Sequence, residues 1–405
     1  MTMSSGRALS IRALLSTFVV VLVAVLYRLN FHSTVIVLLG LGRVIEPIES
    51  FPYDCQRVAH PLLEACEDLW LDEKGRKLYA ACASIPSRLE WFPASLKFNA
   101  SARQRTDHIA VMDIDEPGAD GLYGLRALDV EDEFQGNLDL LGFDARYVDG
   151  NLRFWIINHR PPTDAATGDL LDAWKHGANS TIEIFDLKQG SNKLQHIKTI
   201  HSDALVTPND VAVDKDGNGF IVTNDHAAKM GLWYGLGVAF GGTSLTYCRS
   251  DTGKCHFVAE KSFNIADGVA LGHNGLFYVG DMGLGLIKVY RLVEQQLVYV
   301  DTIHLQVPID NLAVDSQGSI IAATMPDTLQ TLGVIANPYD GLTAPFAAWK
   351  LEPEEGNTYK VTKMIEDRDG KVLPSASVAI HDAQTQRLFL SGVVSQFIAV
   401  CQKRT

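Results

Sequence analysis

The chain has 405 residues, and 47% of them are hydrophobic, so it can bury a large core and is not disordered by composition. It carries 48 acidic against 35 basic residues and no long basic run, which argues against nucleic acid as a partner because phosphate binding requires clustered Lys and Arg. The length allows two or three ordinary domains, or a single all-β barrel or propeller.

The N-terminus is predicted to direct the chain into the secretory pathway. Arg7 and Arg12 precede an apolar run from Ala13 to Tyr27, and a second apolar run extends from Ser33 to Gly42. The first run is typical of a signal-peptide core, but no clean small-x-small cleavage site follows it. We therefore expect residues 1–45 to form an uncleaved signal-anchor or transmembrane segment. The alternative is cleavage, with the second run as an interfacial segment and the rest of the chain secreted.

The chain has six cysteines, and in a protein predicted to enter the secretory pathway they favour disulfide bonds over a redox or zinc site. Two pairs flank short turns and are candidates for local bridges, although the sequence leaves their pairing open. These pairs are Cys66 with Cys82 and Cys248 with Cys255, and the other two cysteines are Cys55 and Cys401. N-glycosylation sequons at Asn99 and Asn179 fit the same lumenal or extracellular compartment.

Residues 46–405 consist of short β-rich runs separated by Gly, Asp and Asn, which predicts an all-β fold. One pattern recurs six times: a polar start, a short apolar run, a turn with Asp or Gly, and a second apolar run. Such a repeat is typical of propeller blades, with the matched hairpin as the inner strand pair. We predict one six-bladed β-propeller over residues 46–405; the alternative is a sandwich of ordinary hairpins. The repeats begin at Glu67, Gly142, Asn209, Asp267, Asp310 and Ser377.

In a propeller, the starts of the inner strands meet at one end of the central channel. Several carboxylates gathered there would repel one another strongly unless a cation neutralised them. The side chains are hard oxygen donors without Cys or His, a set that suits Ca²⁺ better than Mg²⁺. The alternative is that they are turn formers that bond their own backbone. The residues are Glu67, Asp68, Asn209, Asp210, Asp267, Asp310 and Asn311.

Two histidines, His159 and His226, end predicted strands near the same pattern. Either is a candidate general base because imidazole titrates close to neutral pH, and the alternative for each is a position on the rim without a catalytic role. The chain has no G-x-S-x-G, H-E-x-x-H or P-loop motif. The sequence therefore lacks the usual support for a serine-hydrolase, zinc-protease or nucleotide-hydrolase function.

Seven short motifs follow one another along the chain: a cysteine, Glu-Asp-Leu, Asn-His, Asn-Asp-Val-Ala-Val, Thr-Asn-Asp-His, Asp-Asn-Leu-Ala-Val-Asp, and a cysteine near the C-terminus. Their order resembles the serum paraoxonase/arylesterase family over roughly residues 46–405. Members are calcium-dependent six-bladed propellers that hydrolyse lactones, aryl esters and some phosphotriesters. The resemblance therefore implies a small-molecule ester or lactone substrate and two Ca²⁺ ions. It also implies a disulfide between Cys55 and Cys401, and membrane contact through a retained N-terminal apolar segment.

The resemblance also assigns roles by position. The catalytic calcium would be held by Glu67, Asn209, Asp267, Asp310 and Asn311. The second, structural calcium would be held by Asp68, Asp210 and the backbone carbonyl of Phe143. The candidate base is Asp310, or His159 acting through a water molecule.

Three positions depart from the family pattern. Asp267 replaces the usual Asn and adds a third carboxylate, which should tighten calcium binding and reduce the Lewis acidity of the ion. Leu141 stands where the family has the partner of His159 in its catalytic histidine pair, and Gln396 where animal members have histidine. We expect calcium-polarised attack of water on the substrate rather than a two-histidine relay. The alternatives are a dedicated biosynthetic enzyme that opens or isomerises one metabolite, and a non-catalytic, calcium-stabilised binding module.

Overall fold

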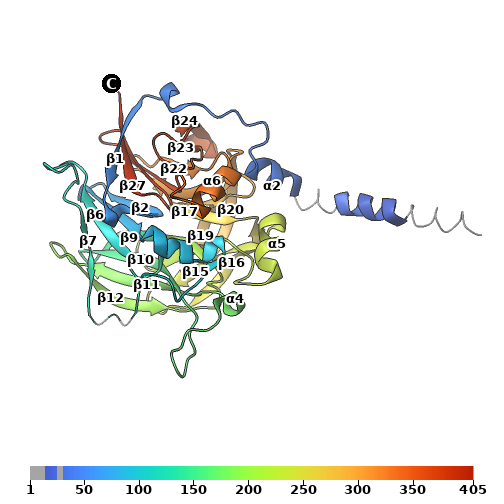
Figure 1. Ribbon diagram of the computed structural model, residues 1–405, viewed down its shortest axis with the longest axis horizontal. Helices are drawn as coiled ribbons and strands as arrows, with labels where there is room; N and C mark the ends of the chain where they lie inside the picture. Colours follow the sequence, from blue (N-terminus) through green and yellow to red (C-terminus); the bar gives the residue numbers. More distant parts are fainter. Residues whose placement is uncertain (1–13, 25–30, 133, 135, 405) are drawn as a thin grey trace, which may run out of the picture.

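The computed structural model describes residues 14–24, 31–132, 134 and 136–404. Six β-sheets are arranged as blades around one axis, as Figure 1 shows, and this confirms the predicted six-bladed β-propeller. Each of the six sequence repeats forms the inner hairpin of one blade. The sandwich alternative is therefore wrong.

The first three blades run from the inner to the outer strand in chain order, and an extra edge strand, β8, is added to the second. Blade 1 contains β2 (Asp68–Asp72), β3 (Lys77–Cys82), β6 (His108–Asp113) and β7 (Arg126–Ala127). Blade 2 contains β9 (Leu140–Val148), β10 (Asn151–Arg160), β11 (Asn179–Leu187), β12 (Lys193–Ile200) and β8 (Asp129–Val130). Blade 3 contains β13 (Pro208–Val213), β14 (Gly219–Asn224), β15 (Thr243–Arg249) and β16 (Cys255–Phe263).

The last three blades each have four strands. Blade 4 contains β17 (Ala266–Leu271), β18 (Leu276–Asp281), β19 (Leu286–Val293) and β20 (Gln296–His304). Blade 5 contains β21 (Ile309–Val314), β22 (Ile320–Thr324), β23 (Phe346–Pro353) and β24 (Tyr359–Asp367). Blade 6 contains β25 (Val378–Asp382), β26 (Arg387–Ser391) and β27 (Phe397–Lys403). Its outer strand is β1 (Tyr53–Ala59), from the N-terminal part of the chain.

The ring is closed by pairing the first strand with the last. β1 runs antiparallel to β27, and Cys55 lies opposite Cys401 in this pair. A disulfide joins these two cysteines across a sequence separation of 346 residues. The pairing implied by the family resemblance is thus confirmed. Both candidate local bridges also form, between Cys66 and Cys82 and between Cys248 and Cys255.

The core consists of apolar layers between neighbouring blades. Phe154 of β10 packs in a cluster with Tyr79 of blade 1, whereas the next residue, Trp155, packs in a cluster with Phe220 of blade 3. Successive side chains of a strand point to opposite faces, and here both faces are covered by other blades. Inner strands therefore appear in the sequence as continuous apolar runs rather than as an alternating pattern.

Helices and short segments lie outside the blades. The described helices are α2 (Phe31–Leu38), α3 (Ile85–Glu90), α4 (Ala173–His176), α5 (Leu232–Phe240) and α6 (Thr328–Ala336), and residues 14–24 are also helical. The 3-10 turns are η1 (Ile48–Ser50), η2 (Pro61–Leu63), η3 (Pro93–Ser95) and η4 (Glu355–Asn357), and β4 (Trp91–Phe92) pairs with β5 (Lys97–Phe98).

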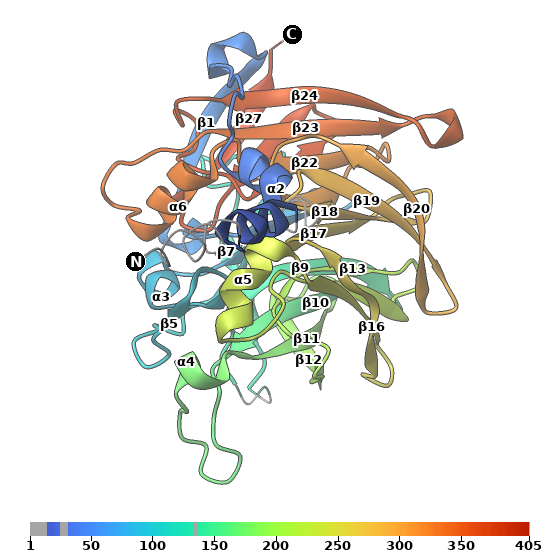
Figure 2. The same cartoon turned by 90° about the vertical axis from the view of Figure 1, so that its right-hand side faces the viewer.

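The predicted anchor at residues 1–45 is described only in part, because residues 1–13 and 25–30 lie outside the described residues. Within the described residues, no helix has both the length and the apolar character needed to cross a membrane. The second apolar run forms part of α2, which lies beside α5 (Figure 2). Thr34 of α2 is 2% exposed, and its Oγ1 accepts a hydrogen bond of 2.6 Å from Asn264 Nδ2. The anchor stays a prediction.

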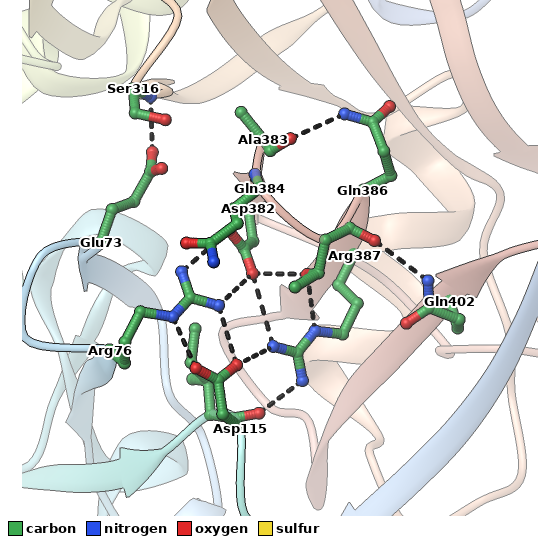
Figure 3. A network of polar contacts seen from close by, with 12 residues as sticks. Glu73, Arg76, Asp115, Ser316, Asp382, Ala383, Gln384, Gln386, Arg387 and Gln402 are labelled. Carbon is green, nitrogen blue, oxygen red and sulfur yellow. Dashed lines mark hydrogen bonds and ion pairs between the residues drawn. The ribbon is translucent and has the colours of Figure 1, made fainter.

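An ion-pair network joins blade 1 to blade 6, where the ring closes. Figure 3 shows Arg76 and Arg387 bound to Asp115 and Asp382. Arg76 lies 2.7 Å from each of these carboxylates, and Arg387 lies 2.6 Å from Asp115 and 3.4 Å from Asp382. Burial alone would raise the pKa of Asp382, but hydrogen bonds from Arg76 and Thr385 lower it to about 2. The network therefore stabilises the closed ring most when Asp382 is ionised.

We expect Asp382→Asn to lower the free energy of unfolding by about 2 kcal/mol at pH 7, because charged hydrogen bonds to two arginines are lost. The folded-state pKa of Asp382 lies below its unfolded value of about 4, so the ionised pair stabilises above that pH and its contribution disappears as pH falls through about 2. Urea unfolding of the full chain at several pH values measures this difference. Asp54→Asn, which removes a carboxylate whose side chain is 71% exposed, is the control. Equal stability of Asp382→Asn and wild type at pH 7 would contradict the prediction.

Candidate functional site

Four neighbouring inner strands begin with a β-bulge at the same position. In each, two residues of the inner strand lie opposite a single residue of its partner. The bulged pairs are Leu141-Gly142, Asn209-Asp210, Asp267-Gly268 and Asp310-Asn311. A bulge bends the strand and re-aims side chains, and bulges are frequent next to active sites. Of the polar residues that sequence analysis singled out at strand starts, Asn209, Asp210, Asp267, Asp310 and Asn311 are therefore bulge residues. Glu67 and Asp68 lie at the start of β2, which pairs with β3 without a bulge.

Two glycines allow neighbouring bulges to pack directly against each other. A Cβ atom at Gly142 would lie 2.5 Å from the carbonyl oxygen of Asn209, and one at Gly268 would lie 2.4 Å from that of Asp310. Both distances are far too short for a non-bonded contact. Glycine therefore lets the bulge of blade 2 approach that of blade 3, and the bulge of blade 4 approach that of blade 5.

The predicted ligands of the catalytic calcium are buried and hold free acceptor atoms. Glu67, Asn209, Asp267, Asp310 and Asn311 are between 2% and 8% exposed. Four of these residues, from four different blades, have a buried oxygen without a hydrogen-bond partner. These oxygens are Glu67 Oε2, Asn209 Oδ1, Asp267 Oδ1 and Asn311 Oδ1. Because buried polar atoms are nearly always paired, such a group of acceptors fits a bound cation.

Direct contacts join four of these side chains in two pairs. Asn311 Nδ2 donates to Glu67 Oε1 at 2.9 Å, which connects blade 5 to blade 1. The carboxyl groups of Asp267 and Asp310 hydrogen-bond to each other. In the part of the chain that the structure describes, no three His, Cys, Asp or Glu side chains form a metal cluster by themselves. The candidate set therefore consists of three carboxyl groups together with the amides of Asn209 and Asn311.

The charge state of the carboxyl groups points to the same need for a cation. Burial raises the pKa of Glu67 to about 7. Burial, together with repulsion between the carboxylates, raises the pKa values of Asp267 and Asp310 well above their usual range. A divalent cation would allow all three to ionise at neutral pH, and their hard oxygens fit Ca²⁺.

The residues predicted for the structural calcium make backbone hydrogen bonds between blades. Asp68 Oδ2 accepts from the N–H of Phe143 at 2.9 Å, and Asp210 Oδ2 accepts from the N–H of Val269 at 2.7 Å. Each of the two aspartates also accepts from the N–H of the next residue, as turn formers do. Asp68, Phe143 and Asp210 line one cavity of about 230 Å³. The two aspartates therefore join neighbouring inner strands in addition to any role as ligands.

His159 is buried at the end of β10 and is 4% exposed. Its Nδ1 lies 2.8 Å from Ser180 Oγ, and Trp91 Nε1 donates to its backbone carbonyl at 2.7 Å. Burial lowers the pKa of His159 to about 4, so the imidazole is neutral at physiological pH. Leu141, at the position of the missing family histidine, is 1% exposed and packs in an apolar cluster with Phe92.

The family resemblance implied no role for His226. Its buried acidic partner, Asp225, contacts the candidate metal site. The Nδ1 atom of His226 lies 2.7 Å from Asp225 Oδ1, and the imidazole ring stacks on Tyr234 with a centroid separation of 3.9 Å. Asp225 Oδ2 accepts from Asn209 Nδ2 at 3.3 Å. Burial alone would raise the pKa of Asp225, but His226, Thr207 and Asn209 together lower it. The Thr-Asn-Asp-His motif was the sequence signal for this pair.

The other predicted positions lie at the surface. Asn99 and Asn179 are exposed, as a glycan acceptor must be, and glycosylation at these sites stays a prediction. Gln396 is also exposed.

Comparison with known proteins identifies the family of this chain. A family model described as Arylesterase matches residues 163–401, more than half of the chain. Serum paraoxonase/lactonase 3 of Rattus norvegicus is 26% identical over 322 residues, which cover 77% of this chain and 78% of the relative. Serum paraoxonase/arylesterase 2 of Gallus gallus is 26% identical over 314 residues, which cover 74% and 80%. The solved structure of a luciferin-regenerating enzyme aligns with a TM-score of 0.48 at 11% identity, covering 86% of this chain and 95% of that one. The chain belongs to the serum paraoxonase/arylesterase family.

Proposed function

We propose that this protein is a calcium-dependent hydrolase of lactones or aryl esters, with phosphotriesters as a further substrate class to test. One observation carries the proposal: four predicted ligands from four blades each have a buried oxygen without a partner, and three carboxyl groups of the set have raised pKa values. The relatives named as a lactonase and an arylesterase support the choice of substrate class.

The proposed ligands lie at or near the starts of the inner strands of five blades. Glu67, Asn209, Asp267, Asp310 and Asn311 would hold the catalytic ion, and Asp68, Asp210 and the carbonyl of Phe143 would hold the structural one. When bound, Ca²⁺ supplies a Lewis acid that polarises the carbonyl or phosphoryl oxygen of the substrate and stabilises developing negative charge.

The protein itself must accept a proton from the attacking water. His159 is a candidate because its imidazole is neutral, so one of its two ring nitrogens carries a lone pair that can accept a proton. Asp310 is the alternative, because it belongs to the candidate metal set and therefore lies beside the reacting atoms. Asp225 and His226 form a further acid–histidine pair in contact with Asn209.

The covered surroundings of His159 favour a second candidate, a dedicated enzyme that opens or isomerises one metabolite. The segment from α3 to β5 closes over this histidine: Trp91 donates to the carbonyl of His159 at 2.7 Å, and the carbonyl of Pro93 accepts from Tyr234 at 2.5 Å. The two cavities beside His159 have about 10 Å³ each, room for a water molecule but not for an ester. Calcium binding without activity on generic esters would favour this candidate.

We also infer a secretory-pathway location with membrane contact through the N-terminal segment. Three disulfides support an oxidising compartment. In the helix at residues 14–24, Leu14 is 70% exposed and Phe18 is 65% exposed, and Leu232 and Trp233 of α5 are 74% and 62% exposed. Contiguous exposed apolar side chains of this kind are typical of membrane-contact surfaces.

Calcium removal should abolish both activity and part of the stability. We expect two calcium ions per chain by metal analysis, and hydrolysis of phenyl acetate and of a lactone panel that stops with chelator and returns with Ca²⁺. Calcium at about 100 times its dissociation constant should stabilise the fold by about 2.7 kcal/mol per site, measured as a raised unfolding midpoint. Magnesium at the same concentration is the control. Turnover that persists in chelator, or no ester hydrolysis by a folded, calcium-loaded protein, would refute the proposed function.

Asp267→Asn tests the extra carboxylate. We expect calcium affinity to fall about tenfold, because one negative charge leaves the ligand set, while kcat at saturating calcium stays the same or rises because the ion becomes a stronger Lewis acid. Calcium titration followed by kinetics at saturating calcium separates the two effects. Asp301→Asn, on the outer strand β20 of the same blade, should change neither quantity. Unchanged affinity in Asp267→Asn would remove Asp267 from the ligand set.

Membrane contact is tested by fractionation of cells expressing the full chain. We expect the protein to stay with membranes after washing with high salt, since apolar contact is not screened by ions, and to be released by detergent. A variant in which a cleavable signal peptide replaces residues 1–30 should move into the soluble lumenal fraction. Release of the full chain by salt alone would contradict the proposed contact.

A further inference from the structure

His159 lines two small cavities, each of about 10 Å³, which is room for one water molecule. Their other polar lining residues include Arg88, Asp107 and Asp139 in the first, and Ser180, Asp225 and His226 in the second. The ring of His159 therefore lies between a buried acidic and basic cluster and the acid–histidine pair that contacts Asn209.

Three buried polar atoms around the first cavity have no hydrogen-bond partner: Arg88 Nε, Asp139 Oδ2 and His159 Nε2. The other polar atoms of these groups are bonded, since Asp139 Oδ1 accepts from Arg103 Nε at 2.9 Å and His159 Nδ1 meets Ser180 Oγ. An arginine nitrogen can only donate, an ionised carboxylate can only accept, and an imidazole nitrogen does either. One water molecule, with two hydrogens and two lone pairs, satisfies all three atoms.

We propose that a buried water held by Arg88, Asp139 and His159 connects His159 to the carboxyl pair of Asp139 and Asp107. This relay takes the place of the second histidine, which the chain lacks at Leu141. The inference rests on the proposed hydrolytic function, because it describes how a proton leaves that site.

Hydrolysis of an ester by water gives a carboxylate, an alcohol and one proton, so a buried site must pass one proton to solvent in each turnover. As the water oxygen bonds to the carbonyl carbon, its O–H bond breaks and a proton reaches His159 Nδ1 through the second cavity and Ser180. The proton on Nε2 moves to the water in the first cavity, which gives one of its own to Asp139. His159 returns to its starting tautomer when the leaving alkoxide takes the Nδ1 proton through Ser180 and Asp139 returns its proton to Nε2 through the water. The carboxylic acid product carries the net proton of the reaction to solvent.

Asp107 is suited to share the proton that reaches Asp139. Its Oδ2 accepts from the N–H of Leu140 at 2.8 Å, which fixes the carboxyl group at the cavity. Burial, partly offset by Arg88, raises the pKa of Asp107 to about 7, so it gains and loses a proton near neutral pH. The proton on Asp139 can therefore be shared with Asp107 until the alkoxide is released.

Asp139→Asn in the full chain tests the relay with two readouts. The first is the ¹⁵N imidazole spectrum of His159, assigned with His159→Gln, which is independent of catalysis. We expect the Nε2 shift to move in Asp139→Asn and to return in Asp139→Glu. The second is kinetics, for which we expect kcat to fall about 100-fold with KM within twofold of wild type. The matched control is Asp186→Asn in the same blade, since Asp186 is also 5% exposed and bonds Arg153 at 2.6 Å.

The outcomes separate this inference from the proposed function. An unchanged Nε2 shift in Asp139→Asn, or a kcat no lower than that of Asp186→Asn in an active enzyme, overturns the relay. If the wild type hydrolyses no ester, the proposed function fails. In that case the imidazole spectrum alone decides whether the water links His159 to Asp139.

Discussion

Burial of carboxylates around the channel axis is the constraint on which the rest of the structure depends. Glu67, Asp68, Asp210, Asp267 and Asp310 are each at most 6% exposed, and burial together with mutual repulsion disfavours their charged forms. Two arrangements reduce the cost of these buried charges. Asp68 and Asp210 accept backbone N–H groups of the next blade, whereas Glu67 and Asp267 each retain an oxygen free for a cation. The two predicted calcium sites thus differ in what already stabilises their ligands.

The bulges and the closure of the ring fix the positions of the axial carboxylates. The bulges of blades 3, 4 and 5 contain Asn209-Asp210, Asp267 and Asp310-Asn311, and Gly142 and Gly268 permit neighbouring bulges to touch. A propeller with a loose seam would let the blades separate and the carboxylates become hydrated. The disulfide between β1 and β27 and the arginine network between blades 1 and 6 stabilise that seam.

Much of the site was accessible from sequence because its ligands are adjacent residues at one phase of a repeat. Asn209-Asp210 and Asp310-Asn311 stand out before apolar runs, where sheets usually exclude such residues. The bulges were not predicted, because one extra residue in a strand leaves no mark in composition or hydrophobic pattern. His226 was a candidate base from sequence, but a role for Asp225 was missed, since its partner Asn209 is reached only when β13 and β14 fold together.

The sequence by itself determined the all-β fold, the six inner hairpins and the chemical type of the axial ligands, because repeat phase and residue type are local properties of the chain. Only the tertiary structure decided which oxygens stay unpaired and that Arg88, Asp139 and His159 surround one small cavity. These three residues come from α3, the loop before β9 and the end of β10. Their contact depends on how blades 1 and 2 pack, and hydrogen-bond satisfaction is a property of the packed molecule rather than of any segment.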